Sequence, residues 1–318
     1  MRLSALVRFL AWSLSAIFFA QAYAAPLADI NSLVAQIVGA AGQVNYTGIA
    51  TYEYAGRRSI VRLSSRMHEG MRHRQVDYLD GGPRKISHHA DDINCLSEEN
   101  LEPLMGTFLG VHGLHRNLYK HYSVVVDNPS QVGGRGVNVL RIIPNDAHRF
   151  GYVVGLDVTT GLVLRAALVN AQGQALERFQ FLELMVEPPS NDTVLNIIPQ
   201  RGPCQAAVRA KRLEQPGWFP EWLPPGFELR AHGAGHADRL WTYLYSDGIA
   251  GISIFIEPTG TQVPPSFDAN LGATAVLHRQ AKLGKQSYSV SIVGEIPRAT
   301  AKKIANQIKY RDEKQPQR

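Results

Sequence analysis

The stretch that decides the fold spans residues 144–187 and reads PNDAHRFGYVVGLDVTTGLVLRAALVNAQGQALERFQFLELMVE. Three runs rich in apolar and β-branched residues follow one another in it, at 152–157, 162–170 and 176–186. The short segments between these runs, 159–161 and 171–173, each end in glycine and are typical of hairpin turns. The stretch therefore predicts three consecutive antiparallel strands.

Similar runs extend this pattern toward the N-terminus. Further strands are expected at 45–54, 59–67, 75–79, 85–89, 122–127 and 138–143. Apolar residues at helical spacing predict one amphipathic helix over 28–40. Many antiparallel strands with few helices indicate a strongly curved sheet or open barrel, which has a concave face to fill.

A proline-rich stretch over 189–216 interrupts the pattern and predicts an extended linker. Beyond it, strands are expected at 227–232, 240–245, 249–257, 273–280 and 287–294, followed by a helix that begins near Pro297. This second part reads as a small antiparallel sheet covered by one helix. The predicted fold class is therefore α+β, mostly antiparallel β, with a large open-barrel domain and a smaller sheet-and-helix domain.

The N-terminus predicts a secreted protein. Arg2 and Arg8 supply positive charge before an uncharged apolar stretch at 9–20. The A-x-A pattern Ala22-Tyr23-Ala24 follows this stretch. This is the pattern of a cleaved Sec-type signal peptide, and the stretch is shorter than the ~20 residues that span a bilayer. The expected division is a signal peptide at 1–24, an N-terminal domain at 25–188, the linker at 189–216, a C-terminal domain at 217–310 and a disordered tail at 311–318, all in the periplasm.

The net charge indicates which classes of molecule the protein can bind, and the two cysteines raise the question of a disulfide. The formal net charge is +6, and loss of the two arginines of the signal peptide leaves +4. A mildly basic chain favours anionic partners such as lipid phosphates or acidic peptides, while no basic run resembles a nucleic-acid recognition helix. Cys95 and Cys204 would enter an oxidising compartment, either as a disulfide or as two separate thiols.

Patterns for catalysis, cofactors and metals are missing. Gly251-Ile252-Ser253-Ile254-Phe255 lacks the second glycine of a nucleophile elbow, and Ser246-Asp247-Gly248 has the composition of a hairpin turn. Gly133-Gly134-Arg135-Gly136 lacks the spacing of a phosphate loop, and the histidines show no metal-ligand spacing. The sequence therefore predicts a binding protein rather than an enzyme, without cofactor or metal.

Aromatic side chains leave two interpretations open. Tyr46, Tyr52 and Tyr54 share one face of the first strand, either as core or as part of a groove for acyl chains or apolar peptide side chains. Four more aromatic residues belong either to the core of the second domain or to a surface at the hinge between domains: Trp218, Phe219, Trp222 and Phe227.

Blocks along the whole mature chain resemble the MucB/RseB family, the periplasmic negative regulators of envelope-stress sigma factors. Besides residues 144–187, the resemblance is carried by the segments 46–48, 83–95, 222–227, 245–248, 255–258, 272–274, 293–297 and 299–301. It implies an N-terminal domain like the lipoprotein carriers LolA and LolB, an unclosed barrel with helices in its mouth. It also implies a smaller C-terminal domain.

The resemblance also implies a function. Members of the family bind the periplasmic domain of a membrane-bound anti-sigma factor of the RseA/MucA type and shield it from the initiating protease. Lipopolysaccharide or lipid A fragments are thought to relieve that protection. The alternative is a periplasmic lipid or lipoprotein carrier of the LolA type, which does not require the second domain.

Site residues follow as hypotheses. Tyr46, Tyr52 and Tyr54 with Arg62 and Arg66 are expected to bind lipid, through apolar contact and through pairing of guanidinium groups with phosphates. The residues expected to bind the protein partner are aromatic: Trp222, Phe227, Tyr245 and Phe255. The sequence leaves the oligomeric state open, a homo-oligomer included.

Overall fold

The computed structural model describes residues 29–68, 71–81, 85–89, 114–187, 217–235, 240–259 and 265–311. The expected signal peptide, Cys95, Cys204, the linker at 189–216 and the tail beyond residue 311 lie outside these residues, so their assignments stay predictions. Within the described ranges, no helix combines the length and apolarity needed to cross a membrane.

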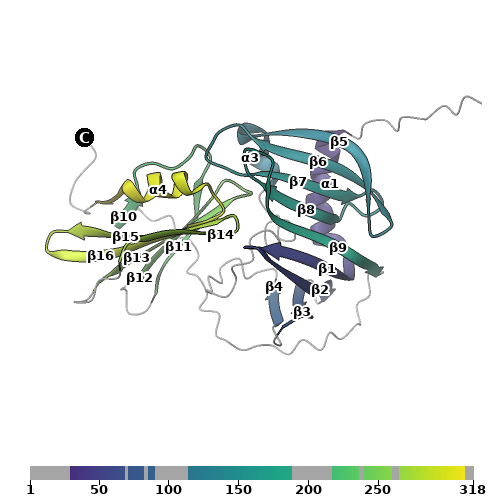
Figure 1. Cartoon of the computed structure of the whole chain (residues 1–318), viewed down its shortest axis with the longest axis horizontal. Coiled ribbons are helices and arrows are strands. Elements are labelled where there is room, and N and C mark those ends of the chain that lie inside the picture. Colours follow the sequence, from purple (N-terminus) through teal and green to yellow (C-terminus); the bar gives the residue numbers. More distant parts are fainter. Residues whose placement is uncertain are drawn as a thin grey trace, which may run out of the picture.

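The first half of the chain forms one curved, antiparallel sheet in the order β4-β3-β2-β1-β9-β8-β7-β6-β5 (Figure 1). Its strands are β1 (Asn45–Tyr54), β2 (Arg57–His68), β3 (Met71–Tyr78), β4 (Lys85–His89), β5 (Tyr122–Val132), β6 (Arg135–Pro144), β7 (Gly151–Asp157), β8 (Val163–Val169) and β9 (Ala175–Glu187). Neighbouring strands are joined by hairpins, except that β1 and β9, far apart in sequence, pair in the middle. Since β4 and β5 are the two edges of this order, the barrel stays open.

Helix α1 (Ile30–Gln43) supplies part of the first core. Asp29 caps its N-terminus, since the carboxylate accepts from the backbone N–H of Asn31 and Ser32. Leu33, Val34 and Ile37 have exposed fractions of 1% or less. They join one buried cluster with residues of most of the strands, so the helix and the sheet share a core. Helix α3 (Leu114–His121) lies beside α1 and leads into β5.

The second half forms a smaller antiparallel sheet in the order β11-β12-β13-β16-β15-β14, with α4 across one face (Figure 1). Its elements are β11 (Glu228–Gly235), β12 (Leu240–Ser246), β13 (Gly251–Pro258), β14 (Phe267–Leu271), β15 (Thr274–Leu283), β16 (Gln286–Gly294) and α4 (Arg298–Asn306). The short strands β10 (Gly217–Pro220) and β17 (Ile308–Arg311) pair with each other. Ile252, Ile254 and Ile304 lie in a core that is separate from the first.

These observations confirm the predicted fold class: mostly antiparallel β, with a large open sheet and a smaller sheet covered by one helix. Pro297 directly precedes the first residue of α4, which agrees with the predicted start of this helix near Pro297. The sequence patterns missed α3, β10, β14 and β17, which are short. Segments of four to eight residues show too little periodicity to be recognised without their neighbours.

Gly48 explains how β1 and β9 approach each other at the centre of the large sheet. The β1–β9 register shifts between Ile49 and Ala50. A Cβ atom on Gly48 would lie 2.5 Å from the carbonyl oxygen of Glu183 and 2.6 Å from a ring carbon of Phe181. Any side chain here would have to displace backbone, and for that reason only glycine fits.

We therefore expect Gly48→Ala to lower the free energy of unfolding by about 1–3 kcal/mol through overpacking. Gly233→Ala is the matched control, because Gly233 is also a strand residue but has open space where its Cβ would stand. Urea denaturation of both variants measures the difference. Equal stability of the two variants would show that the β1–β9 contact can relax around a methyl group.

Candidate functional site

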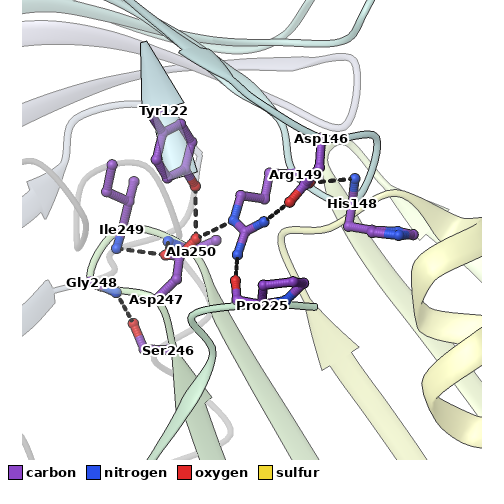
Figure 2. A network of polar contacts seen from close by, with 10 residues as sticks. All are labelled: Tyr122, Asp146, His148, Arg149, Pro225, Ser246, Asp247, Gly248, Ile249 and Ala250. Carbon is purple, nitrogen blue, oxygen red and sulfur yellow. Dashed lines mark hydrogen bonds and ion pairs between the residues drawn. The ribbon is translucent and has the colours of Figure 1, made fainter. Parts of the chain in front are cut away.

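The two domains meet around the side chain of Arg149, which follows β6 in the first domain. Its side chain is fully buried, and Nε donates a hydrogen bond to Asp247 Oδ2 in the second domain at 2.7 Å (Figure 2). The guanidinium also donates to the Asp146 carboxylate and to the carbonyl oxygen of Pro225. One cation of the first domain is thus held by two oxygen acceptors of the second.

Asp247 is fixed by the hairpin turn between β12 and β13. Its Oδ1 accepts from the backbone N–H of Ile249 and of Ala250, each at 2.9 Å. Its Oδ2 also accepts from the hydroxyl of Tyr122 at 2.9 Å, a second bond across the junction (Figure 2). The turn predicted for Ser246-Asp247-Gly248 is confirmed. The same turn also presents its carboxylate to the other domain.

The electrostatics of this pair follow from burial. Desolvation alone lowers the pKa of Arg149, but the hydrogen bond and the charge of Asp247 outweigh it, so the pKa is raised above its ordinary value. Burial, followed by the charge of Asp247, raises the pKa of Tyr122 well above 10.0. Tyr122 therefore remains a hydrogen-bond donor to Asp247 throughout the physiological range.

Two of the aromatic residues predicted to bind a partner lie at this junction. The Arg149 guanidinium carbon is 5.1 Å from the centroid of the Phe227 ring, a cation–π distance. Trp222 meets His148 edge-on at 5.0 Å, and the ammonium of Lys303 lies 3.7 Å from its ring centroid. His148 Nδ1 is 3.1 Å from the hydroxyl of Thr300 in α4.

The other two aromatic residues predicted to bind a partner, Tyr245 and Phe255, lie away from the Arg149 network. Tyr245 is 6% exposed and belongs to the core of the second domain. Phe255 lies beside Thr242 and Ser291 in the sheet, on the strand face opposite to Ile254. The structure therefore does not gather the four residues into one surface, and their role in partner binding stays a prediction.

A second contact joins the domains at the far end of β1. The hydroxyl of Tyr54 is 3.4 Å from that of Thr274, and the backbone N–H of Ala273 donates to Glu177 Oε1 at 3.3 Å. Glu177 Oε2 accepts from the hydroxyl of Tyr52 at 3.3 Å. Glu177 is only 1% exposed, and this buried carboxylate accepts hydrogen bonds from both domains.

The residues predicted to bind lipid are spread over different environments. Tyr46 and Tyr52 are 3% and 4% exposed and belong to the core of the first domain, and Tyr54 packs against it. Arg62 is exposed on β2. Arg66 donates to the carboxylate of Glu187, from Nε at 2.7 Å. Lipid binding by this set stays a prediction.

Gly226 brings the second domain unusually close to the first. Its φ of +89° lies in the left-handed region that favours glycine. A Cβ atom here would lie 2.1 Å from Nε2 of His121, in α3. The Pro225-Gly226-Phe227 segment, whose carbonyl and ring both contact Arg149, therefore requires glycine at its centre.

Glu295 adds an ionisable group that the sequence patterns did not single out. It is 8% exposed, and its Oε2 has no hydrogen-bond partner among the described residues. Burial, followed by the charge of Glu177, raises its pKa well above 4.5. Within the described ranges no cluster of three or more potential metal ligands occurs. The junction thus combines carboxyl, guanidinium and hydroxyl groups with Ile249 and Ala273, which join the core of the first domain.

Comparison with known proteins agrees with this architecture. The MucB/RseB N-terminal domain model matches residues 29–200, and the MucB/RseB C-terminal domain model matches residues 212–309. The chain belongs to the MucB/RseB family. Sequence blocks that carried the resemblance, 144–187 and 222–227, supply Arg149 and Phe227 to the junction.

Individual relatives cover most of the chain. The sigma factor AlgU regulatory protein MucB of Pseudomonas aeruginosa is 31% identical over 293 residues, which is 89% of this chain and 91% of the relative. The sigma-E factor regulatory protein RseB of Escherichia coli K12 is 24% identical over 252 residues, 74% and 76% of the two chains. The crystal structure of MucB in complex with MucA(peri) aligns with a TM-score of 0.69 at 28% identity, over 89% of this chain and 99% of that one.

Sequence reasoning missed the residues that hold the junction together. Asp247 was assigned only to a turn, and Arg149, Glu177 and Glu295 were not singled out. The available signal was weak: each is a charged residue inside or beside an apolar strand. Such a residue often lies on a solvated face, and its burial becomes visible only when the opposite domain is in place.

We expect Arg149→Met to lower the free energy of unfolding by about 3–5 kcal/mol, since it leaves the buried Asp247 carboxylate without its cation. Arg141→Met is the control: Arg141 pairs with Asp127, but the two side chains are 48% and 37% exposed. An exposed pair contributes about 0–1 kcal/mol. Chemical denaturation compares the two, and a loss for Arg149→Met no larger than for Arg141→Met would contradict the structural role of the pair.

Glu295 predicts a pH dependence of stability. A carboxyl group with a raised folded-state pKa stabilises the fold fully below its ordinary pKa of 4.5, and this contribution is lost as the pH rises through the folded-state value. Glu295→Gln keeps the neutral shape and removes the titration. The variant should therefore match the wild type in acid and become the more stable of the two as the pH rises.

Thermal unfolding from pH 4.5 to pH 9 measures this difference, with ~1.4 kcal/mol expected for each unit of pKa shift. Glu257→Gln is the control, because Glu257 is an exposed carboxylate of the same domain, in β13. Parallel pH profiles for wild type and Glu295→Gln would show that Glu295 ionises without cost in the folded protein.

Proposed function

We propose that this chain is a periplasmic regulator that binds the periplasmic region of a membrane-bound anti-sigma factor. By shielding that region from regulated proteolysis, it restrains an envelope-stress sigma factor. The observation that carries the proposal is the alignment over 89% of this chain with MucB, which was crystallised in complex with MucA(peri). A second complex, that of Pseudomonas aeruginosa MucA/MucB, aligns with a TM-score of 0.67 at 28% identity.

The arrangement of the domains supports this function over that of a lipoprotein carrier. A carrier of the LolA type requires only the first domain. Here the second domain contacts the first through the buried Arg149–Asp247 pair and through Glu177. Charges are costly to bury, and a junction that buries several of them indicates that both domains act as one unit.

The same proposal holds that the protein acts by binding, not by catalysis, and that it is located in the periplasm. The relatives are named regulatory proteins of AlgU and of sigma-E. The predicted signal peptide at 1–24 is the support for export.

Lipid as the relieving signal is a further part of the proposal. Its support is the cationic side chain of Arg72, which shares the inner face of the large sheet with Val76 and is 4% exposed. Its Nη1 donates to three neutral oxygens, those of Val44 O, Asn45 Oδ1 and Ser65 Oγ. Guanidinium groups bind phosphates in bidentate pairs, and a cation on this face is the support for a lipid with phosphate groups.

The test uses residues 25–318 and the periplasmic region of the anti-sigma factor encoded in the same genome. Calorimetry should show a stoichiometric complex, and an unrelated periplasmic domain is the control. Deletion of the gene should raise the output of the sigma factor. No complex in calorimetry, together with unchanged sigma-factor output in the deletion strain, would overturn the proposed function.

A further inference from the structure

A cleft of about 430 Å³ opens at the end of the large sheet where β1, β2 and β9 lie side by side. It is lined by Glu53, Tyr54, Gly56, Arg57, Arg58, Ala175, Leu176, Glu177 and Arg178. Its volume falls within the ~300–1,000 Å³ of typical ligand clefts. Neither the network at Arg149 nor the lipid hypothesis accounts for it.

The strand register places positive charge along this cleft. Glu53 of β1 lies between Arg58 of β2 and Arg178 of β9. Arg58 Nε donates to Glu53 Oε1 at 2.7 Å, and Arg178 Nη1 reaches Glu53 Oε2 at 3.4 Å. One carboxylate is therefore shared by two guanidinium groups.

Arg57 adds a third cation. It lies opposite Tyr54 in the register, is exposed, and forms no ion pair with any described residue. The second acid of the lining, Glu177, is already engaged, because its two oxygens accept from Tyr52 and Ala273. Arg58 and Arg178 thus share the one carboxylate of Glu53, and Arg57 is left without an acidic partner among the described residues. The lining holds three arginines against two carboxylates, an excess of positive charge.

The rest of the lining limits the ligand. Only Tyr54, Ala175 and Leu176 offer apolar surface, which is enough for one aliphatic side chain and too little for several acyl chains. The guanidinium side chains of Arg58 and Arg178 are 71% and 63% exposed, so they are accessible to an extended chain that carries carboxylates. Planar guanidinium groups bind carboxylates in bidentate pairs.

We propose that this cleft binds an acidic segment of the anti-sigma factor's periplasmic region, with a carboxylate at Arg57 beside the exposed Arg58 and Arg178 and an aliphatic side chain on Leu176. The proposal rests on the proposed function and gives that partner a docking site. Tyr54 and Glu177 line the cleft and also contact Thr274 and Ala273 of the second domain. A segment bound here therefore touches the groups that join the domains.

The test uses the mature chain with the charge reversals Arg57→Glu and Arg57→Glu/Arg178→Glu. Arg141→Glu is the matched control, since Arg141 is an exposed arginine of the same sheet that does not line the cleft. The probes are the periplasmic region of the anti-sigma factor, a capped hexapeptide of alternating leucine and glutamate, and its leucine–glutamine analogue. Circular dichroism confirms folding of each variant.

We expect Arg57→Glu to weaken binding of the anti-sigma region and of the glutamate peptide by about five- to tenfold, and the double variant more. Arg141→Glu should bind within twofold of wild type. The glutamine analogue should bind weakly to all of them. Raising the salt concentration from 50 to 500 mM should reduce the difference between wild type and Arg57→Glu, because salt screens exposed charges.

Two results would overturn the docking site. One is undiminished affinity of the double variant for an anti-sigma region that wild type binds, which leaves the proposed function intact. The other is Arg57-dependent binding of phosphatidylglycerol vesicles without binding of the glutamate peptide, which assigns the cleft to lipid phosphates. Absence of any wild-type complex with the anti-sigma region, by contrast, counts against the proposed function itself. In that case, Arg57-dependent binding of the glutamate peptide still supports an acidic-peptide site.

Discussion

Arg149 and Asp247 bury opposite charges at the contact between the two domains, where Ile249 and Ala273 of the second domain also join the core of the first. Removing both charges from water costs several kcal/mol per ion, and only close geometry with further hydrogen bonds compensates for it. Here Tyr122, two backbone N–H groups and the Pro225 carbonyl complete the bonding. Because a buried charge pair is stable only with close geometry and with its further hydrogen bonds made, it favours one relative position of the domains.

Other residues of the junction also depend on the close approach of the two domains. Glu177 accepts one hydrogen bond from each domain, and Glu295 remains buried where its charged form is disfavoured. Gly226 allows the backbone to pass against His121 without a side chain between them. All of these features depend on the approach of the two domains, which makes their separation costly. This suits a protein that presents a partner with one continuous surface.

Membership in the MucB/RseB family gives these features a functional setting. A regulator of this kind acts by occupying its partner, so affinity and release matter and reactive groups do not. The three arginines of the cleft lie next to the contact between the domains that Glu177 forms. The Arg149 network lies at the other contact between the domains. Recognition of a partner and cohesion of the domains can therefore involve neighbouring residues without using the same side chains.

The sequence by itself determined the local elements. Apolar runs at 152–157 and 162–170, separated by turns that end in glycine, predicted β7 and β8. Pro297 predicted the start of α4. Both predictions succeeded because turn and helix-start preferences act over a few residues. The block resemblance also indicated the family and the two-domain organisation. Short elements such as β14 and β17 were missed, since they are defined by their neighbours in the sheet.

Only the tertiary structure decided which polar residues matter. Arg149 and Asp247 are 98 residues apart in sequence, and Glu177 is 96 residues from Ala273. A charged residue in a strand pattern looks the same whether it faces water or the opposite domain. Tyr52 illustrates the point: its spacing placed it on an apolar face, but its hydroxyl lies against a buried carboxylate. The burial of a polar residue and the identity of its hydrogen-bond partners depend on the folded chain, so the local spacing of residues in the sequence does not predict them.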